Sequence, residues 1–347
     1  MPTRLRLFTQ QLARPEFDTP AEVVAWMAAV QAQEITLSKW AVGLRTKTPS
    51  LSAVERALES GDILRMHILR PTWHYVAAKD AGWMVQISGP RIKAAWTSFA
   101  RHNGIALDGS FFAQARKILE KVLFGKSLSR AELAEEFVSR GLDVTEHTLR
   151  YVLCCAEADG LVCSGPARGR THTYMLMEER VKNASACPRE EALFRLARLY
   201  FQSHSPASLE DFTWWSGLPI SEARRAVLSL GAELAREFFG GRELFVHTSC
   251  PAGEESSGVV HLLPPFDEFL ISYKDRSDAL DPKHQPKAFN RFGTFYPVIL
   301  ADGKIVGNWQ NNGKSAPAET SFFVRRHGVD KIALAAAQKR YLNFLAG

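Results

Sequence analysis

The chain has 347 residues, more than one hydrophobic core usually supports, so roughly two to four domains are expected. Its apolar content of 46% is ordinary for a folded protein. The sequence has no run of about 18 apolar residues that could span a bilayer, and its first residues lack the apolar core of a secretion signal. These features argue against a membrane or secreted protein, and we expect a cytoplasmic one.

The charge is unevenly distributed along the chain. Lys and Arg number 43 against 37 Asp and Glu, giving a net charge of +6 and a pI near 9.1, which favours a polyanionic partner. Residues 91–130 hold eight basic side chains but only two acids, Asp108 and Glu120. This stretch predicts either a surface that faces nucleic acid or a solvated helix face.

The five cysteines form no metal-binding or redox pattern. No CxxC pair occurs, and no histidine accompanies a cysteine at zinc-finger spacing, so no structural metal is expected. Cys154 and Cys155 fall within an apolar helical pattern, which indicates buried, unreactive thiols.

Residues 1–104 predict a degenerate winged-helix-like unit. The segments TPAEVVAWMAAV (19–30) and SLSAVERALESG (50–61) have helical spacing, and DILRMHILRPTWHYVAA (62–78) predicts two strands around Arg70 and Pro71.

Gln31 and Gln33 lie where the first helical pattern runs out. Residues two apart point about 200° apart on a helix but share one face of an extended segment. The two amides can therefore act on one substrate only if residues 31–34 are not helical, which we predict. The helix that contains Val23, Met27 and Val30 should end near Val30.

Residues 105–182 predict a complete winged helix. Three helices are expected, FFAQARKILEKVLFG (111–125), SRAELAEEFVSRG (129–141) capped by Ser129, and TEHTLRYVLCCAEADG (145–160) capped by Thr145. The strands LVCSG and THTYMLM follow, joined by the turn PARGR. We expect the third helix to enter a DNA major groove, and Arg168 and Arg170 in the hairpin to contact phosphates.

Residues 183–250 repeat this order as a second winged helix. The helices are REEALFRLARLYFQSH (189–204), SLEDFTWWSG (208–217) capped by Ser208, and LPISEARRAVLSLG (218–231), followed by the hairpin LAREFFGGRELFVHT (234–248) with its turn at Gly240 and Gly241. Trp214 and Trp215 are expected in the core or at an interface.

Residues 251–347 predict a β-rich region. PAGEESSG (251–258) is expected to be a linker, and strands follow in VVHLLPP (259–265), in YPVILADGKIVGNW (296–309) around an Asp302-Gly303 turn, and in SFFVRR (321–326), before the helix DKIALAAAQKRYLNFLAG (330–347). The expected fold class is α+β, with tandem winged helix-turn-helix units and a β-rich C-terminal region.

Several blocks, in this order, resemble the winged-helix superfamily of bacterial DNA glycosylases that unhook interstrand crosslinks. They are VQAQEITLSKWAVGLR, LRPTWHYVAAKD, DGLVCSGPARGRTHTYMLMEE, SLEDFTWWSGLPISEAR, LLPPFDEFLISYKDRS and DGKIVGNW. The resemblance implies hydrolysis of the N-glycosidic bond of N7-alkylated purines in DNA repair. The catalytic Gln-x-Gln signature of the family falls on Gln31 and Gln33. A sister branch carries Asp at the second position, so the chain is similar to the azinomycin-resistance branch.

The chemistry fits two amides. An N7-alkylguanine is already cationic and leaves without protonation, so the usual acidic carboxylate of a glycosidase is not needed. Gln31 and Gln33 are expected to hold a water and stabilise positive charge on the sugar, not to act as general bases. The resemblance implies a monomer that binds double-stranded DNA with alkylated or crosslinked purines, associates with the nucleoid, and uses no metal or cofactor.

Other residues have alternative roles. We assign DNA contacts to Arg45, Arg70, His74, Arg168 and Arg170, although the alternation in TWHYV makes His74 a structural hydrogen-bonding residue more readily than a base. Asp267 and Glu268 are alternative catalytic carboxylates, for which a helix cap or a buried ion pair is the competing role. Trp40 and Trp73 either pack in the core or stack near the lesion.

The competing function is that of a non-catalytic winged-helix DNA-binding protein, such as a transcriptional regulator. Several DNA-binding-like units within one chain favour the enzyme.

Overall fold

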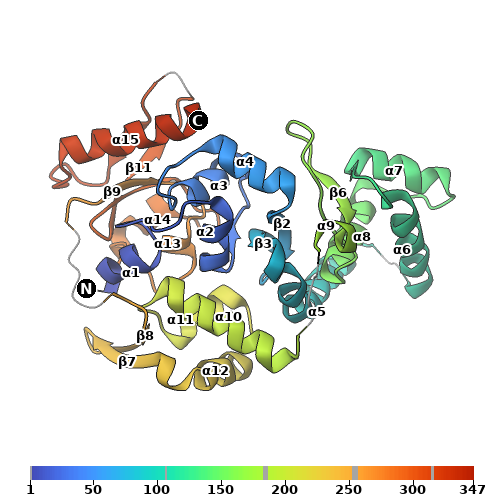
Figure 1. Ribbon diagram of the computed structural model, residues 1–347, viewed down its shortest axis with the longest axis horizontal. Coiled ribbons are helices and arrows are strands. Elements are labelled where there is room, and N and C mark those ends of the chain that lie inside the picture. The colour runs from blue at the N-terminus through green and yellow to red at the C-terminus, as the bar shows by residue number, and fades with distance from the viewer. Residues whose placement is uncertain (1, 106–107, 183–186, 252–256, 314–315) are drawn as a thin grey trace. The chain divides into compact units, whose positions relative to one another are not determined.

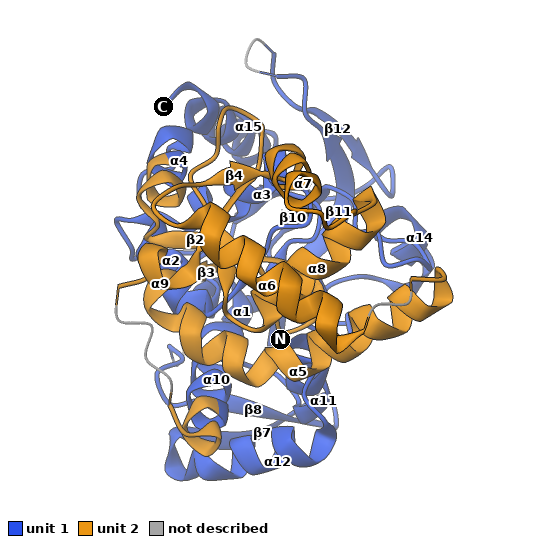
Figure 2. Cartoon of the chain, turned by 90° about the vertical axis from the view of Figure 1, so that its right-hand side faces the viewer, with its two compact units in different colours: residues 1–55, 193–347 blue, residues 56–192 orange. Residues whose placement is uncertain are grey.

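The computed structural model describes residues 2–105, 108–182, 187–251, 257–313 and 316–347 (Figure 1). Contacts group the chain into two units, which Figure 2 colours separately: residues 1–55 with 193–347 form unit 1, and residues 56–192 form unit 2. This grouping differs from the four expected domains. Residues 1–55 join the C-terminal part of the chain because side chains such as Trp40, whose indole donates to the Leu262 carbonyl, are buried there.

Unit 1 combines helices with an antiparallel sheet. Its first elements are α1 (Pro2–Thr9), α2 (Pro20–Met27), β1 (Val30–Gln31), α3 (Ile35–Gly43) and α4 (Leu51–Ser60), the last of which crosses into unit 2. Then come α10 (Arg189–His204), which begins in unit 2, α11 (Leu209–Ser216), α12 (Ile220–Ser229), η1 (Gly231–Glu233), β7 (Leu234–Phe239) and β8 (Arg242–His247). The C-terminal elements are β9 (Val260–Leu263), α13 (Glu268–Ile271), η2 (Pro282–His284), α14 (Gln285–Ala288), β10 (Val298–Ala301), β11 (Lys304–Gln310), β12 (Glu319–Phe322) and α15 (Lys331–Ala346).

The C-terminal sheet has the strand order β12-β11-β10-β9, with every pair antiparallel. Buried and half-buried residues alternate along β11, which places Trp309 in the core. Its indole donates to the Leu263 carbonyl at 2.7 Å, and its ring contacts Tyr341 of α15 with centroids 4.9 Å apart. The C-terminal helix is therefore anchored to this sheet by aromatic contacts.

Unit 2 contains the expected order of three helices and a hairpin. Its elements are β2 (Ile63–Ile68), β3 (Thr72–Ala77), α5 (Ala78–His102), α6 (Gly109–Leu123), β4 (Leu128–Ser129), α7 (Arg130–Ser139), α8 (Glu146–Ala158), β5 (Val162–Ser164), β6 (Thr173–Leu176) and α9 (Met177–Arg180). The hairpin strands form a small antiparallel sheet in the order β4-β6-β5. The two strands predicted around Arg70 are the antiparallel pair β2 and β3.

Local sequence signals account for most of these elements. Ser129 and Ser208 form the predicted helix caps, with capping boxes completed by Glu132 and Asp211, and Thr19 forms a further capping box with Glu22 that was not predicted. The expected hairpins are present at Gly240-Gly241 and at Asp302-Gly303. The long helix α5 was not among the predicted elements. Most of the expected linker, residues 252–256, lies outside the described residues.

Helix α8 is buried around its circumference from Tyr151 to Ala158, so the expected contact with a DNA groove is left to its first turns. Leu149, Val152, Leu153 and Ala156 join a core with α6 and α7. The opposite side of α8, from Tyr151 to Ala158, forms a second cluster against α5. A helix covered around its circumference is a core helix. Only the first turns of α8 keep exposed side chains, at Glu146, His147 and Arg150.

The basic stretch from residue 91 to residue 130 is mostly exposed on α5, α6 and the segment that follows. Four of its cations pair with carboxylates, as Lys93–Asp159, Arg116–Glu120, Lys126–Glu136 and Arg130–Glu146. The solvated helix face is therefore a good description of much of this stretch. No helix in the described part of the chain is long and apolar enough to cross a membrane.

Gly89 is expected to be required where α5 meets α8. A Cβ atom at this position would lie 2.2 Å from the Ala158 carbonyl oxygen, which belongs to the backbone and cannot rotate away. Gly89→Ala should destabilise the protein by about 1–3 kcal/mol, because overpacking outweighs the helix-propensity gain of about 1 kcal/mol. Chemical denaturation measures this loss.

Gly109→Ala is the matched control, since no atom lies within 4 Å of a Cβ placed there at the start of α6. It should leave the free energy of unfolding unchanged or slightly raised. Equal stabilities for the two variants would contradict the tight α5–α8 contact.

Candidate active site

The segment of the two glutamines is not helical, as predicted. Helix α2 ends at Met27, three residues before Val30, and Ala28 has a positive φ of 62°. Residues 31–34 then form a short extended segment and a bend before α3 begins at Ile35. The Glu34 carboxylate caps α3 by accepting hydrogen bonds from Thr36 N and Leu37 N. The chain thus has no helical constraint that would turn the two amides to opposite sides.

The two glutamines differ in their exposure. Gln31 is 4% exposed, whereas Gln33 is an exposed residue. A substrate could reach Gln33 directly, and Gln31 lies beneath the surface. Joint action of the two amides stays a prediction.

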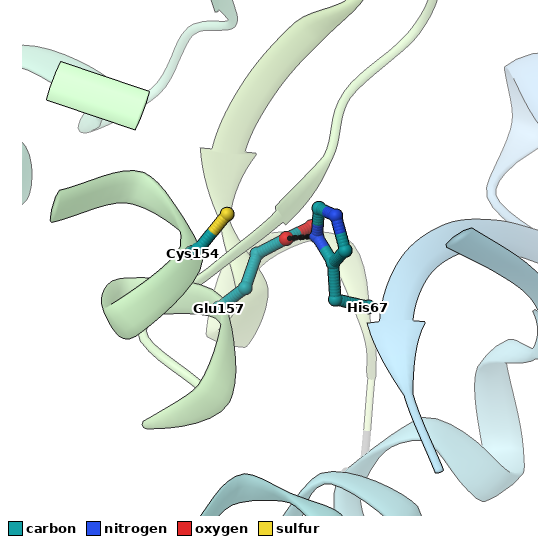
Figure 3. A group of neighbouring side chains, drawn as sticks. All are labelled: His67, Cys154 and Glu157. Atoms are coloured by element: carbon teal, nitrogen blue, oxygen red, sulfur yellow. Dashed lines mark hydrogen bonds and ion pairs between the residues drawn. The ribbon is translucent and has the colours of Figure 1, made fainter. Parts of the chain in front are cut away.

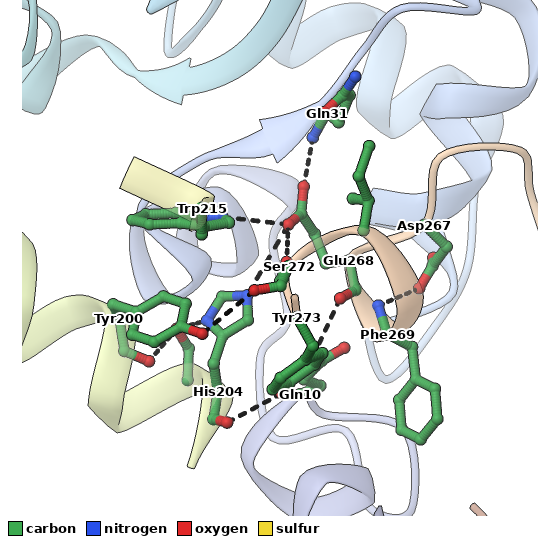
Figure 4. A network of polar contacts seen from close by, with 12 residues as sticks. Gln10, Gln31, Tyr200, His204, Trp215, Asp267, Glu268, Phe269, Ser272 and Tyr273 are labelled. Atoms are coloured by element: carbon green, nitrogen blue, oxygen red, sulfur yellow. Dashed lines mark hydrogen bonds and ion pairs between the residues drawn. The ribbon is translucent and has the colours of Figure 1, made fainter. Parts of the chain in front are cut away.

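Glu268 holds the backbone of Gln31. Its Oε1 accepts a hydrogen bond from Gln31 N at 2.6 Å, and its Oε2 accepts from Trp215 Nε1 at 3.2 Å and from the Ser272 hydroxyl (Figure 4). The carboxylate is fully buried on the first turn of α13. It is therefore committed to at least three donors inside the protein, which favours a structural role over that of a catalytic carboxylate.

His204 completes this buried network. Its Nε2 lies 3.8 Å from Glu268 Oε2, and its ring stacks on Tyr200 with centroids 4.7 Å apart. Burial lowers the pKa of His204, and the neighbouring carboxylate of Glu268 only partly opposes this shift. Tyr273 donates to the His204 carbonyl and accepts from Gln10. Residues from α10, α11 and α13 thereby fix the position of β1.

Asp267 has the competing role that the sequence offered, since it is both a helix cap and a member of a buried ion pair. Its Oδ1 accepts from Phe269 N at the start of α13. The Arg45 guanidinium binds both oxygens of Asp267, at 2.8 and 3.0 Å. Arg45 also donates to the Ala41 carbonyl and, through two atoms, to Gln10. All five N–H donors of this guanidinium are used inside the protein.

This burial corrects two of the expected DNA contacts. Arg45 is 0% exposed and committed to Asp267, so it offers no donor to a phosphate. His74 is also 0% exposed, and its Nδ1 lies 2.9 Å from the Thr72 carbonyl oxygen. A structural hydrogen-bonding role, as TWHYV suggested, suits that position better than a DNA contact. In sequence, a buried arginine cannot be told from a surface one until its carboxylate partner is known.

The two tryptophans left open by the sequence have different surroundings. Trp40 is a core residue, since it is 1% exposed and its ring contacts Tyr341 and Phe344. Trp73 is half-buried, and its ring lies against His67 at a tilt of 39°, with ring centroids 3.9 Å apart. Of the predicted Trp pair on α11, Trp215 is in the core and Trp214 is 41% exposed.

The remaining candidate DNA contacts belong to unit 2. Arg168 and Arg170 lie at the tip of the β5–β6 hairpin, and Arg70 lies in the turn between β2 and β3. Arg168 donates to both carboxylate oxygens of Glu132, and this contact, together with the hydrogen bonds from Ser129, lowers the pKa of Glu132 to about 2. Arg170 is exposed. Gln31, Gln33 and Arg45 belong to unit 1.

The buried Arg45–Asp267 pair should be important for stability. Asp267→Asn keeps the size of the side chain and a capping oxygen but leaves the guanidinium unneutralised. We expect a loss of about 3–5 kcal/mol in the free energy of unfolding, as for other buried pairs that lose one partner. Urea denaturation followed by tryptophan fluorescence measures it.

Asp18→Asn is the control, because Asp18 pairs with Lys47 at 3.0 Å on the surface. An exposed pair of this kind contributes at most about 1 kcal/mol. If both variants lost equally little, Arg45 would have to be hydrated or otherwise compensated.

Comparison with known proteins agrees with this architecture. The family described as DNA glycosylase AlkZ-like matches residues 24–344. The interstrand DNA cross-link repair glycosylase of Streptomyces sahachiroi is 26% identical over 325 residues, which cover 88% of this chain and 85% of that protein. The solved structure of Streptomyces sahachiroi DNA glycosylase AlkZ superposes with a TM-score of 0.83 at 23% identity, covering 99% of this chain and 95% of that chain. Since the family match extends over nearly the whole sequence, the chain belongs to the AlkZ-like DNA glycosylases.

Proposed function

We propose that this DNA glycosylase hydrolyses the N-glycosidic bond of N7-alkylated purines, including purines joined in interstrand crosslinks. The name of the Streptomyces sahachiroi relative supports crosslink repair as the biological context. The observation that carries the catalytic part is the non-helical segment 31–34, in which Gln31 is held by Glu268 and Gln33 is exposed.

The proposed chemistry needs only weak polar groups. Alkylation at N7 gives the purine a positive charge, so that the base leaves without a proton from the enzyme. The amide oxygens of Gln31 and Gln33 would orient the attacking water and stabilise the positive charge that develops on the sugar. Because an amide is too weak a base to take a proton, positioning and electrostatics are its share of the catalysis.

The hydrogen bond from Gln31 N to Glu268 supports this proposal. It accepts the backbone N–H of Gln31 and is itself held by Trp215 and Ser272. A catalytic group has to be fixed before substrate arrives if its orientation is to lower the barrier. We infer that Glu268 positions Gln31 and does not itself touch the substrate.

The finer fold assignment also belongs to the proposal. We infer that residues 105–182 and 183–250 are two winged helix-turn-helix units that bind double-stranded DNA, with the enzyme acting as a monomer. In residues 105–182 the hairpin tip with Arg168 and Arg170 would contact phosphates, and only the exposed first turns of α8 would be able to approach DNA. In residues 183–250, helix α12 keeps Arg224 and Arg225 exposed and is the better candidate to approach DNA.

The catalytic proposal is tested with duplex DNA that carries N7-methylguanine or a nitrogen-mustard crosslink, without added metal. The enzyme should produce abasic sites that break in alkali and should leave undamaged guanine intact. Gln31→Ala and Gln33→Ala should each lower the single-turnover rate by about 10² to 10³ while DNA affinity is kept, because each removes one stabilising group from the transition state.

Gln310→Ala, at the exposed end of β11, is the matched control and should keep the full rate. Full activity in both Gln31→Ala and Gln33→Ala would exclude the glutamines as the catalytic pair. No base release from any N7-alkylpurine would instead make a non-catalytic DNA-binding protein the better description.

The DNA-binding proposal is tested by salt dependence. Binding of undamaged duplex should weaken steeply with salt, because each neutralised phosphate releases counterions. Replacing both Arg168 and Arg170 by Ala should flatten the slope of log K against log salt by about one unit for each lost contact. Arg14→Ala removes an exposed cation of unit 1 and should leave the slope unchanged. A double variant with the original slope would place the hairpin away from DNA.

A further inference from the structure

Three side chains with metal-binding atoms meet inside unit 2. His67 lies on β2, and Cys154 and Glu157 lie three residues apart on α8 (Figure 3). The exposed fractions of these residues are 5%, 4% and 1%. Their donor atoms, one from each residue, all lie within 4.8 Å of one another. The chain has no zinc-finger spacing at this cluster because one donor comes from a distant strand and another is a carboxylate.

The Glu157 carboxylate is only half satisfied. Its Oε2 lies 2.5 Å from His67 Nδ1, but its buried Oε1 has no hydrogen-bond partner among the described residues. A buried acceptor without a donor is costly, and a buried carboxylate more so. Figure 3 shows the carboxylate pointing toward the imidazole, with the Cys154 sulfur beside them.

The cluster has the surroundings of a closed site. The Trp73 ring lies tilted against His67, and Trp96 meets the same imidazole edge-on with centroids 6.0 Å apart. Burial raises the pKa of the Cys154 thiol, and the negative charge of Glu157 raises it further. Without a cation the thiol is therefore protonated, and the aromatic shell limits access of water.

We propose that His67, Cys154 and Glu157 bind a divalent transition-metal ion, for which Zn²⁺ is the best fit. Thiolate, imidazole and carboxylate are the three ligand types that Zn²⁺ takes in proteins. Thiolate and carboxylate together neutralise the two positive charges of the ion, so the buried site carries no net charge. On binding, the S–H bond of Cys154 breaks, its proton passes to solvent, and a sulfur–metal bond forms, while the neutral imidazole binds through whichever nitrogen carries no proton.

The geometry requires only small movements. Zinc–ligand bonds of about 2.0–2.3 Å place the atoms of a tetrahedral shell roughly 3.3–3.8 Å apart. The donor atoms, which are within 4.8 Å of one another, would move by about 1 Å or less each. The ion would satisfy Glu157 Oε1, and a water would take the fourth position. It would tie α8 to β2 and so act on stability, independently of the proposed glycosylase chemistry.

The test uses full-length protein that has been stripped with a chelator and titrated with Co²⁺, a spectroscopic substitute for Zn²⁺. We expect one equivalent to bind, with a sulfur-to-cobalt charge-transfer band and strong visible bands typical of tetrahedral coordination. Excess Zn²⁺ should remove both signals and raise the Tm. Cys154→Ser should lose the charge-transfer band.

Cys155→Ser is the matched control, because Cys155 is the next residue on α8, is equally buried, and lies outside the cluster. It should keep the complete cobalt spectrum. Glu157→Gln preserves the shape of the side chain and tests the site without the thiol change; circular dichroism checks its fold. It should weaken Co²⁺ binding by at least about 100-fold, more than the loss of an outer-shell partner.

The proposal is overturned if the wild-type protein shows no charge-transfer band at a tenfold excess of Co²⁺. It is equally overturned if Cys154→Ser keeps the band or if Glu157→Gln binds Co²⁺ as tightly as wild type.

Discussion

The buried charges at the start of α13 are the constraint on which unit 1 depends. Asp267 neutralises Arg45, and the next residue, Glu268, accepts donors from Gln31, Trp215 and Ser272. Ions in a protein interior are tolerated only when oriented partners surround them. The segments that follow α1 and α3, the strand β1 and the helix α11 must therefore all reach α13 together. This explains why residues 1–55 belong with the C-terminal part of the chain.

The same buried hydrogen bonds give the carboxylates a structural role and leave the proposed chemistry to other groups. Two adjacent carboxylates would be the obvious choice for acid–base catalysis of glycosidic cleavage, yet here both are enclosed and saturated with hydrogen bonds. In residues 31–34 the exposed amide is that of Gln33, with Gln31 beneath the surface, while the Glu34 carboxylate is used to cap α3. A cationic leaving group makes such a site sufficient, because the substrate brings the activation that an acidic side chain would otherwise provide. Under the proposed mechanism, the carboxylates of Asp267 and Glu268 fix the surrounding backbone, and the amides of Gln31 and Gln33 contact the sugar.

Sequence reasoning succeeded where the cause was local. Ser129 and Ser208 start helices because each carries its own capping partner three residues later, and the hairpin at Gly240-Gly241 needs only its turn. It failed where the cause was distant. Arg45 looked like a surface cation because Asp267 is far along the chain, and α8 looked amphipathic because its second apolar face meets α5, which was not predicted. The family was recognisable because several blocks recur in order.

Helix α8 has a consequence for how unit 2 opens. Its two faces belong to different clusters, one with α6 and α7 and the other with α5. Releasing either side would expose apolar surface of α8 to water, which is unfavourable. The contacts on the other side would still hold the α8 backbone in place, so the chain would gain little conformational entropy in return. We therefore expect a partly open state of unit 2, in which one layer detaches, to be high in free energy. Amide hydrogens in the second half of α8 should then exchange only when the whole unit unfolds.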